Sequence, residues 1–385
     1  MTETIKKIKL FEAFAGIGTQ AMALKRVAKE LGFEVEPVGI CEIDKFAIKS
    51  HQAIHGEIKN FGDISKVNPK ELPDMDLFTY SFPCQDLSIS GKQKGLVEGT
   101  RSGLLYECEK VITAKRPKYL LLENVKNLVG KKFKPDFDKW LEWLESQGYR
   151  NYWQVLNAKD YGVPQNRERV FVVSILCDGD YDFPESFPLE VKLRDILEDE
   201  VDEKYYLSKM PTIVTEHKDV AVLRKERTEY GKQVRKKYES GEFYDKRSNM
   251  TELKPRKDEI SNTITTVQKD NLLYEVRVKE ATKLGYKVAE EGDPINLEHP
   301  NSTTRRGRVG KQVAQTLTTS PQQAILIDYR IRRLTPLECW RLMGIADEDF
   351  YKAKAVGTSD SQLYKQAGNA IVVDVLVGIF REMFK

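Results

Sequence analysis

The stretch that decides the fold is "IKLFEAFAGIGTQAMALKRVAKEL", residues 8–31. A β-rich apolar run leads into a turn with Gly16 and Gly18, and a helical pattern follows at once. Similar runs continue the alternation of strand and helix through the first half of the chain, in "EVEPVGICE", a helical 45–55, "FGDI", "DLFTYSF", "SGLLYECEKVITAK", "PKYLLLENV" and "FDKWLEWLESQGY". Alternating strands and helices imply right-handed crossovers, so the predicted fold class is α/β with a mostly parallel sheet.

Two further apolar runs, "NYWQVLNA" (151–158) and "RVFVVSIL" (169–176), flank a polar insert with Gly162 and Pro164. They predict a hairpin-like antiparallel edge on the sheet. From about residue 178 to 328 the chain is rich in Lys, Glu, Thr and Tyr and loses the alternation, which indicates a smaller domain. A chain of 385 residues is long enough for two domains, since single cores seldom outgrow roughly 250 residues.

Helical patterning returns in "TPLECWRLMG" (335–344), where Thr335 is a predicted N-cap with Pro336 at N1 and Glu338 at N3. It returns again in "AIVVDVLVGIFREMF" (370–384), and we expect this last apolar helix to pack back on the large domain. The predicted organisation is therefore a large domain over residues 1–185, a smaller domain over 186–327 and a C-terminal segment, 328–385, that returns to the large domain.

Composition narrows the class of protein. The 62 Lys+Arg and 59 Asp+Glu give a net charge of +3, which does not decide the partners. The N-terminus lacks a long apolar h-region, and no stretch approaches the roughly 18–20 apolar residues of a membrane span, so we expect a soluble cytoplasmic protein without membrane contact. Five scattered cysteines without a CxxC or Cys/His cluster argue against a disulfide framework and against a metal site.

Residues useful for a ligand stand where the predicted strands end. In a parallel sheet these ends lie along the carboxyl edge, where open α/β sheets bind their ligands. The residues are Phe14, Gly16, Ile17 and Gly18 after the first strand, then Glu42, Asp63, Pro83, Cys84, Gln85, Glu123 and Asn124.

This edge predicts a nucleoside site. Gly16 and Gly18 allow close approach of a ligand, Glu42 can accept hydrogen bonds from ribose hydroxyls, and Asp63 can pair an adenine amino group. Alone, the glycine pattern is equally compatible with a tight strand-to-helix turn; the two acids at consecutive strand ends favour nucleoside binding. The third glycine of GxGxxG is absent, which disfavours NAD and leaves S-adenosylmethionine.

Cys84 stands between Pro83 and Gln85 at a strand end beside this site. A lone cysteine is by default a small buried hydrophobe. Glu123, which closes the apolar "YLLL" run, is expected near Cys84 across the same edge, with a raised pKa because its neighbours are apolar. The pair suggests a nucleophile and an acid.

Six segments resemble the ordered motif set of the DNA (cytosine-5) methyltransferases: "EAFAGIGT", "SFPCQDLS", "LLLENV", "QNRERVFVV", "RRLTPLECWRLMG" and "QAGNAI". The resemblance covers about residues 1–180 and 328–385, in the family's order. It implies a Rossmann-like, SAM-dependent methyltransferase fold with a target-recognition domain inserted over 186–327. The implied reaction carries a methyl group from S-adenosylmethionine to C5 of cytosine and leaves S-adenosylhomocysteine.

The resemblance also implies roles for single residues. Cys84 adds to C6 of the base, Glu123 acts at N3, and Arg167 and Arg169 complete the catalytic set, with Arg169 at the base. "QAGNA" (366–370) completes the methionine end of the cofactor pocket. The implied cofactor-binding residues are Phe14, Gly16, Ile17, Gly18, Glu42, Ile43, Asp63, Ile64, Pro83, Asn369 and Ala370.

The implied partner is double-stranded DNA, with the target cytosine flipped out of the duplex. The segment 303–311, "TTRRGRVGK", has four basic residues and no acid, so its arginines are candidates to read guanine edges or hold phosphates, although a solvated charge run has the same composition. The expected DNA-binding residues are Gln85, Ser88, Arg101, Gln165, Arg305, Arg306 and Arg308.

The resemblance favours a monomeric, bacterial or phage-encoded protein at the nucleoid, compatible with a cognate restriction endonuclease that acts separately. A tRNA cytosine-5 methyltransferase shares the PCQ and ENV-like motifs, but its recognition insert is usually more compact than residues 186–327. A catalytically silent DNA-binding relative is the other alternative, and the intact set of Cys84, Glu123, Arg167 and Arg169 argues against it.

Overall fold

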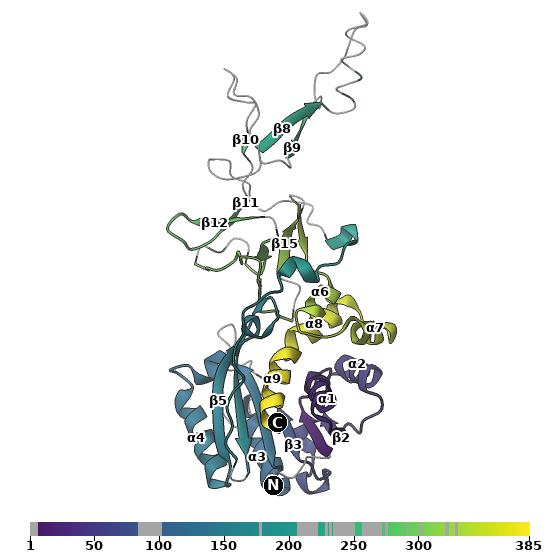
Figure 1. Cartoon of the computed structure of the whole chain (residues 1–385), viewed down its shortest axis with the longest axis vertical. Helices are drawn as coiled ribbons and strands as arrows, with labels where there is room; N and C mark the ends of the chain where they lie inside the picture. Colours follow the sequence, from purple (N-terminus) through teal and green to yellow (C-terminus); the bar gives the residue numbers. More distant parts are fainter. Residues whose placement is uncertain are drawn as a thin grey trace, which may run out of the picture.

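A computed structural model gives the fold (Figure 1). It describes residues 7–83, 102–176, 179–205, 222–227, 230, 233, 251–255, 272–273, 276–290, 292–299, 302, 304–319, 323–327 and 330–385.

A six-stranded sheet in the order β2-β1-β3-β4-β7-β5 forms the centre of the molecule. β1, β2, β3 and β4 run parallel, whereas β7 is antiparallel to both β4 and β5. The predicted α/β class and the antiparallel hairpin at the edge are therefore confirmed. The strands are β1 (Lys7–Ala13), β2 (Glu34–Cys41), β3 (Leu77–Tyr80), β4 (Tyr119–Val125), β5 (Arg150–Asn157) and β7 (Glu168–Ile175).

The sheet buries both of its faces, as parallel sheets do. Alternate residues of β1 show the division: Leu10 belongs to one core and Phe11 to the other. α1 (Thr19–Leu31) and α9 (Val373–Phe384) contribute to the first core, and α3 (Leu105–Lys115) and α4 (Lys134–Ser146) contribute to the second. The carboxyl ends of the parallel strands are left open between these layers.

The C-terminal segment returns to the sheet. It forms α6 (Pro336–Arg341), α7 (Asp347–Ala355), α8 (Asp360–Asn369) and α9, whose last residues pack at the start of β4, where the rings of Phe384 and Tyr119 are 5.1 Å apart. α9 packs against α1, and Arg381 forms an ion pair with Glu30 at 2.8 Å. The capping box at the start of α6 is also confirmed, because the Thr335 side chain accepts from the backbone N–H of Glu338.

One predicted strand is wrong. "FGDI" (61–64) forms no strand: the isolated bridge to Ile40 is made by Asn60, the residue before it, and Asp63 caps the short helix η1 (Ile64–Lys66) instead of ending a strand. α2 (Lys45–His55) lies between β2 and this segment, and further short helices are η2 (Pro69–Glu71), η3 (Ser102–Leu104), η4 (Lys126–Val129), η5 (Ala158–Tyr161), η6 (Leu193–Ile196) and η7 (Glu203–Tyr205).

Small sheets, antiparallel except for the parallel pair of β14 with β6 (Gln165–Asn166), occupy the region between β7 and α6, at the opposite end of the molecule from α9 in Figure 1. One strand of this region, β14, pairs with β6, which directly precedes β7. No helix among the described residues has the length and apolar character to cross a membrane. The strands are β8 (Val222–Arg227), β9 (Thr251–Pro255), β10 (Leu272–Leu273), β11 (Val276–Lys279), β12 (Tyr286–Ala289), β13 (Pro294–Asn296), β14 (Ala314–Gln315), β15 (Gln323–Ile327) and β16 (Arg330–Arg333).

Candidate active site

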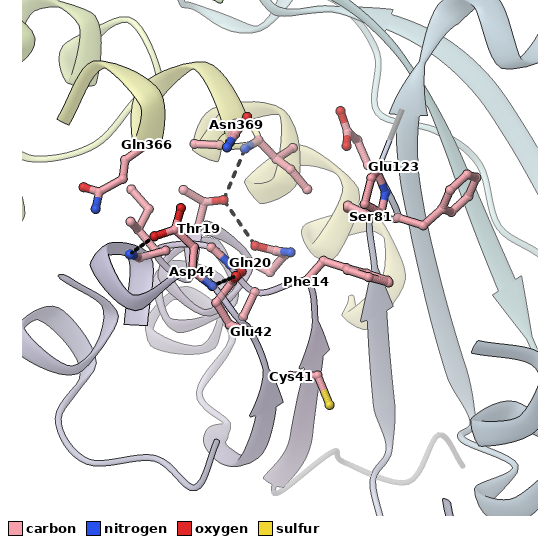
Figure 2. A pocket seen from close by; sticks show the side chains of 18 of the residues that line it. Phe14, Thr19, Gln20, Cys41, Glu42, Asp44, Ser81, Glu123, Gln366 and Asn369 are labelled. Atoms are coloured by element: carbon pink, nitrogen blue, oxygen red, sulfur yellow. Dashed lines mark hydrogen bonds between the residues drawn. The ribbon is translucent and has the colours of Figure 1, made fainter. Parts of the chain in front are cut away.

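A cavity of about 400 Å³ lies at the carboxyl ends of β1, β2, β3 and β4 (Figure 2). Its walls come from segments far apart in the chain: the turn after β1, the ends of the neighbouring strands, and the C-terminal end of α8. The lining residues include Phe14, Gly16, Ile17, Glu42, Ile43, Asp63, Ile64, Pro83, Glu123, Arg167, Arg169, Asn369 and Ala370. The structure thus brings all but one of the residues expected to bind the cofactor to one cavity.

Gly18 is the exception. It does not line the cavity, and it serves as the N-cap of α1 with φ of 80°. A Cβ at this position would overlap with the rings of His51 and His55 behind the turn. The close approach that this glycine permits is therefore to two histidines and not to a ligand.

Glu42 holds the turn after β1 in place. Its Oε2 accepts from the backbone N–H of Gly16 at 2.8 Å, and its Oε1 accepts from the N–H groups of Ile43 and Asp44, both at 2.8 Å. Asp44 caps α2 through Oδ1, while its Oδ2 forms an ion pair with Lys365 of α8 at 2.5 Å. These contacts join β1, α2 and α8 around one side of the cavity.

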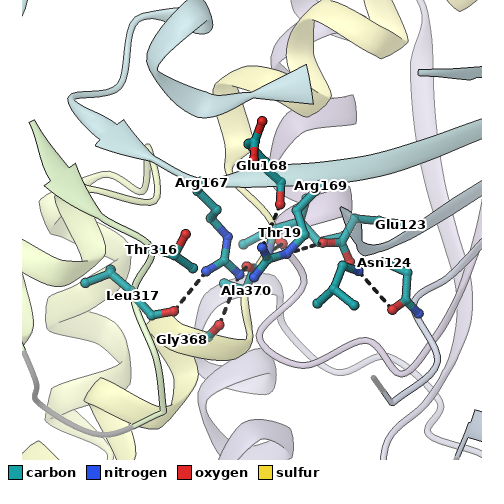
Figure 3. A network of polar contacts seen from close by, with 12 residues as sticks. Thr19, Glu123, Asn124, Arg167, Glu168, Arg169, Thr316, Leu317, Gly368 and Ala370 are labelled. Carbon is teal, nitrogen blue, oxygen red and sulfur yellow. Dashed lines mark hydrogen bonds and ion pairs between the residues drawn. The ribbon is translucent and has the colours of Figure 1, made fainter. Parts of the chain in front are cut away.

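Glu123 and Arg169 face each other at the opposite side of the cavity (Figure 3). The Arg169 Nε and Glu123 Oε1 atoms are 3.1 Å apart, and Glu123 is 8% exposed. Burial raises the pKa of the Glu123 carboxyl, although the charges of Arg169 and Arg167 oppose this shift. Because burial outweighs the two charges, the pKa of the carboxyl is raised, so it keeps a proton to higher pH than an ordinary glutamate and can act as a hydrogen-bond donor.

Arg167 is buried and fastens three chain segments (Figure 3). Its Nη1 donates to the carbonyl of Leu317 at 3.0 Å, and its Nη2 donates to the carbonyls of Gly368 and Ala370 at 3.0 and 2.8 Å. A planar guanidinium suits such a fixed set of acceptors. Arg167 therefore touches the cavity while it ties the end of α8 to the strand region that follows β14.

The turn between α8 and α9 closes the cavity against α1. The backbone N–H of Ile371 donates to Thr19 Oγ1 at 3.4 Å, and a Cβ at Gly368 would overlap with the backbone of Thr318. Gln366 donates to the carbonyl of Phe46 at 3.1 Å and so connects α8 with α2. The "QAGNA" motif thus fits between three elements.

The family model for C-5 cytosine-specific DNA methylases matches residues 8–385. The chain belongs to this family. It is 36% identical to the type II methyltransferase M2.ScrFI of Lactococcus lactis subsp. cremoris, an alignment that covers 98% of this chain and 99% of the relative. It is 33% identical to the orphan methyltransferase M.SPRI of Bacillus phage SPR, with 98% and 97% covered.

Solved structures agree with this fold. The Entamoeba histolytica methyltransferase EhMeth superposes with a TM-score of 0.60 at 16% identity, and 98% of each chain is covered. A putative DNA modification methyltransferase from an Escherichia coli prophage gives a TM-score of 0.59 at 18% identity, again with 98% of each chain covered. At these identities the likeness concerns the fold of the methyltransferase and its mostly parallel sheet.

Several residues of the methyltransferase line the cavity without having been predicted as cofactor-binding. Thr19 and Gln20 follow Gly18 in the first turn of α1, and Lys365 lies on α8 directly before the "QAGNA" motif. For Thr19 and Gln20 the signal was their place at a helix N-terminus directly after the glycine turn. No local pattern points to Lys365, because its position in the cavity depends on the ion pair with Asp44, which is far away in the sequence.

Two residues expected to contact DNA are buried in the protein. Gln165 is 0% exposed; its Nε2 donates to the carbonyl of Leu342 at 2.6 Å, and its Oε1 accepts from Leu317 N–H at 3.0 Å. Arg308 is 4% exposed and its Nη1 donates to the carbonyl of Lys279 at 2.7 Å. Both side chains are buried and make internal hydrogen bonds, so DNA contact through them does not fit the structure.

Arg305 and Arg306, in contrast, are exposed. Arg305 pairs with Glu298 at 3.2 Å, and Arg306 Nε donates to the carbonyl of Ala281 at 2.7 Å. The turn that carries them is fixed from within, since the Glu280 carboxylate accepts from the N–H groups of Gly307 and Arg308 at 3.1 and 2.7 Å. Cys84, Gln85, Ser88 and Arg101 lie outside the described residues.

Proposed function

We propose that this cytosine-5 DNA methyltransferase transfers the methyl group of S-adenosylmethionine to C5 of a flipped-out cytosine through a covalent bond between Cys84 and C6. The observation that carries the proposal is the shared cavity: Glu42 and the turn after β1 stand on one side, and the Glu123–Arg169 pair stands on the other. Cys84 directly follows Pro83, which lines the same cavity. Donor and base would therefore meet in one space.

The residues present fit an adenosyl cofactor. The Glu42 carboxylate uses three backbone N–H groups and, with about four acceptor positions, keeps capacity for a ribose hydroxyl. Ile43 lines the cavity and is 72% exposed, which offers an apolar surface for an adenine ring. Ile17, Asn369 and Ala370 would bound the methionine end. When bound, S-adenosylmethionine supplies an electrophilic methyl group.

The residues of the chain would prepare the base for this methyl group. C5 of cytosine is a poor nucleophile until the ring loses its conjugation. The Cys84 thiolate would form a bond to C6, and the displaced ring electrons would reach N3, where the Glu123 carboxyl donates a hydrogen bond or its proton. The C5 atom then accepts the methyl group. Glu123 takes back any proton that it gave to N3, and loss of the C5 proton to a solvent base re-forms the C5–C6 double bond as the Cys84–C6 bond breaks, so that a methyl group has replaced a proton and the thiolate is restored.

Arg169 would hold the base, and residues 186–327 would recognise the DNA sequence. The Arg169 guanidinium pairs with Glu123, and its Nη1 donates to the carbonyl of Glu168 at 2.8 Å. A cytosine in a duplex must leave the stack to reach such a cavity, at a cost of a few kcal/mol. Arg305 and Arg306 are the described residues that we assign to the DNA phosphates or guanine edges.

The test is a trap with duplex DNA that contains 5-fluorocytosine. Fluorine at C5 cannot leave as a proton, so incubation with S-adenosylmethionine should leave a covalent complex through Cys84, and Cys84→Ala should form none. Labelled donor with a random-sequence duplex then gives the target sequence. Methyl transfer without any adduct in the trap would overturn the mechanism, and transfer to tRNA with none to duplex DNA would overturn the substrate.

A further inference from the structure

Behind the turn after β1 lies a group of ionisable side chains that the proposed reaction does not use. This rear cluster consists of Glu12 on β1, His51 and His55 on α2, and Lys25 on α1. Glu12 and His51 are fully buried, with 0% of each side chain exposed. None of the four residues lines the cavity, whereas Phe14, Ala15, Gly16 and Ile17 of the turn do.

His55 has a defined tautomer. Lys25 Nζ lies 3.3 Å from His55 Nδ1, and His55 Nε2 lies 3.1 Å from the carbonyl oxygen of Ile17. Because a lysine ammonium only donates, Nδ1 accepts and the ring proton resides on Nε2, which donates to Ile17. Burial and the neighbouring His51 lower the pKa of His55 to about 4, so the ring is neutral at physiological pH. Lys25, His55 and Ile17 thus form a directed chain of hydrogen bonds.

Glu12 and His51 act on the next residues of the chain. Glu12 Oε1 accepts from the N–H of Ala21 in the first turn of α1 at 3.3 Å, and its Oε2 lies 3.8 Å from His51 Nε2. The rings of His51 and His55 are 4.6 Å apart. A carboxylate at a helix N-terminus is stabilised by the unpaired N–H groups there. The rear cluster therefore holds both the Ile17 carbonyl and the start of α1.

We propose that the rear cluster positions the Phe14–Gly18 turn for binding of the methyl donor, with His55 as the residue that fixes the Ile17 carbonyl. This inference rests on the proposed function, because it takes the cavity as the donor site. Gly18 fits the same arrangement: any side chain there would collide with His51 and His55. The four members are positioning residues, since they act through the turn and touch no ligand.

The test compares His55→Phe with His55→Gln. Glutamine can still donate from Nε2 to the Ile17 carbonyl, whereas phenylalanine fills the space without a donor. Affinity for S-adenosylhomocysteine is measured by calorimetry, beside kcat and the KM values for donor and DNA. We expect His55→Phe to raise the Kd and the donor KM about tenfold. In His55→Gln both values should stay within about threefold of wild type. In both variants kcat and the DNA KM should change by less than about threefold. Gln52→Ala, an exposed site on the same helix, is the control and should match wild type.

The outcomes separate the inference from the function on which it rests. Wild-type protein that fails to bind S-adenosylhomocysteine would contradict the donor site itself. Wild-type binding with an unchanged Kd in His55→Phe, or an equal loss in both His55 variants, would overturn the positioning role. Should His55→Phe not fold, Lys25→Met provides the test. Lys25 is exposed, and this substitution removes the ammonium group that sets the His55 tautomer. We expect the Kd to rise about threefold, and an unchanged Kd would overturn the proposal.

Discussion

Glu123 experiences two opposing influences that together suit it to acid chemistry. Burial disfavours its charged form, while Arg169 at 3.1 Å favours it. With burial the larger influence, the pKa of the carboxyl is raised, and the proton stays within reach of the cavity. Glu168, the neighbour of Arg169 in sequence, has the same side chain but pairs with Lys126 on the surface at 2.9 Å.

Glu123→Gln should lower kcat by about 10²- to 10⁴-fold, because the amide keeps the shape of the side chain but cannot give up and regain a proton as the carboxyl does. The Kd for S-adenosylhomocysteine should change little, since Glu123 stands at the opposite side of the cavity from Glu42. Steady-state kinetics and calorimetry check both values. Glu168→Gln is the matched control and should keep wild-type kcat. A Glu123→Gln enzyme with more than about a tenth of wild-type kcat would remove the acid role.

The position of a single side chain could be predicted where its neighbours in the sequence define its environment. Glu42 directly follows β2, and Glu123 follows the apolar run that begins β4, so their places at the carboxyl edge could be predicted from the ends of the predicted strands. The prediction failed for Arg308, because basic side chains are usually exposed. The burial of Arg308 depends on the carbonyl of Lys279, 29 residues earlier, which no local pattern reveals.

At the scale of the elements, helix ends were predictable and short strands were not. The capping box of α6 uses residues three positions apart, so the pattern of Thr335 and Glu338 predicts it from the sequence. "FGDI" has the composition of a strand end but forms no strand, and the one isolated bridge nearby, Asn60 to Ile40, lies just before it. Strand pairing is decided by a partner elsewhere in the chain, whereas a cap is decided within one turn.

Thr335→Ala should lower the free energy of unfolding by about 1 kcal/mol, and the melting temperature by about 2 °C, because the N–H of Glu338 loses its acceptor. Calorimetry measures both. Ser359→Ala is the control: Ser359 is the N-cap of α8 but its side chain caps no backbone N–H of that helix and contacts only the Ser361 hydroxyl, at 3.1 Å, so its loss should cost little. Equal effects of the two substitutions would show that capping does not explain the stability of α6.

At the scale of the whole molecule, the small sheets are joined to the central sheet through a few specific contacts. β14 pairs with β6, and Arg167 and Gln165 hydrogen-bond to the backbone of Leu317, which follows β14. These residues are about 150 positions apart, so the sequence predicted the two regions but not their connection. Arg167 and Arg169 line the cavity from β7 and the residues before it. The hydrogen bonds of Arg167 and Gln165 thereby connect the segment after β14 to the wall of the candidate active site.

Replacement of Arg305 and Arg306 tests whether the exposed turn of the small sheets meets DNA. Each arginine that neutralises a phosphate contributes about 0.9 to the slope of log Kobs against log salt, so Arg305→Ala with Arg306→Ala should reduce that slope by up to about 2. Both side chains are exposed, and the melting temperature should therefore stay near that of wild type.

Two other arginines make this experiment specific. Arg308→Ala should lower the melting temperature by roughly 5 °C or more, because it removes a buried group that donates to the carbonyls of Lys279 and Asn296. Arg381→Ala, on α9 at the far end of the molecule, should leave both the salt slope and the affinity for DNA unchanged. Fluorescence anisotropy with a labelled duplex between 50 and 200 mM salt gives the slopes. A double variant at 305 and 306 with the wild-type slope would place the phosphate contacts on other residues, because arginines that contact no DNA phosphate release no counterions from the DNA.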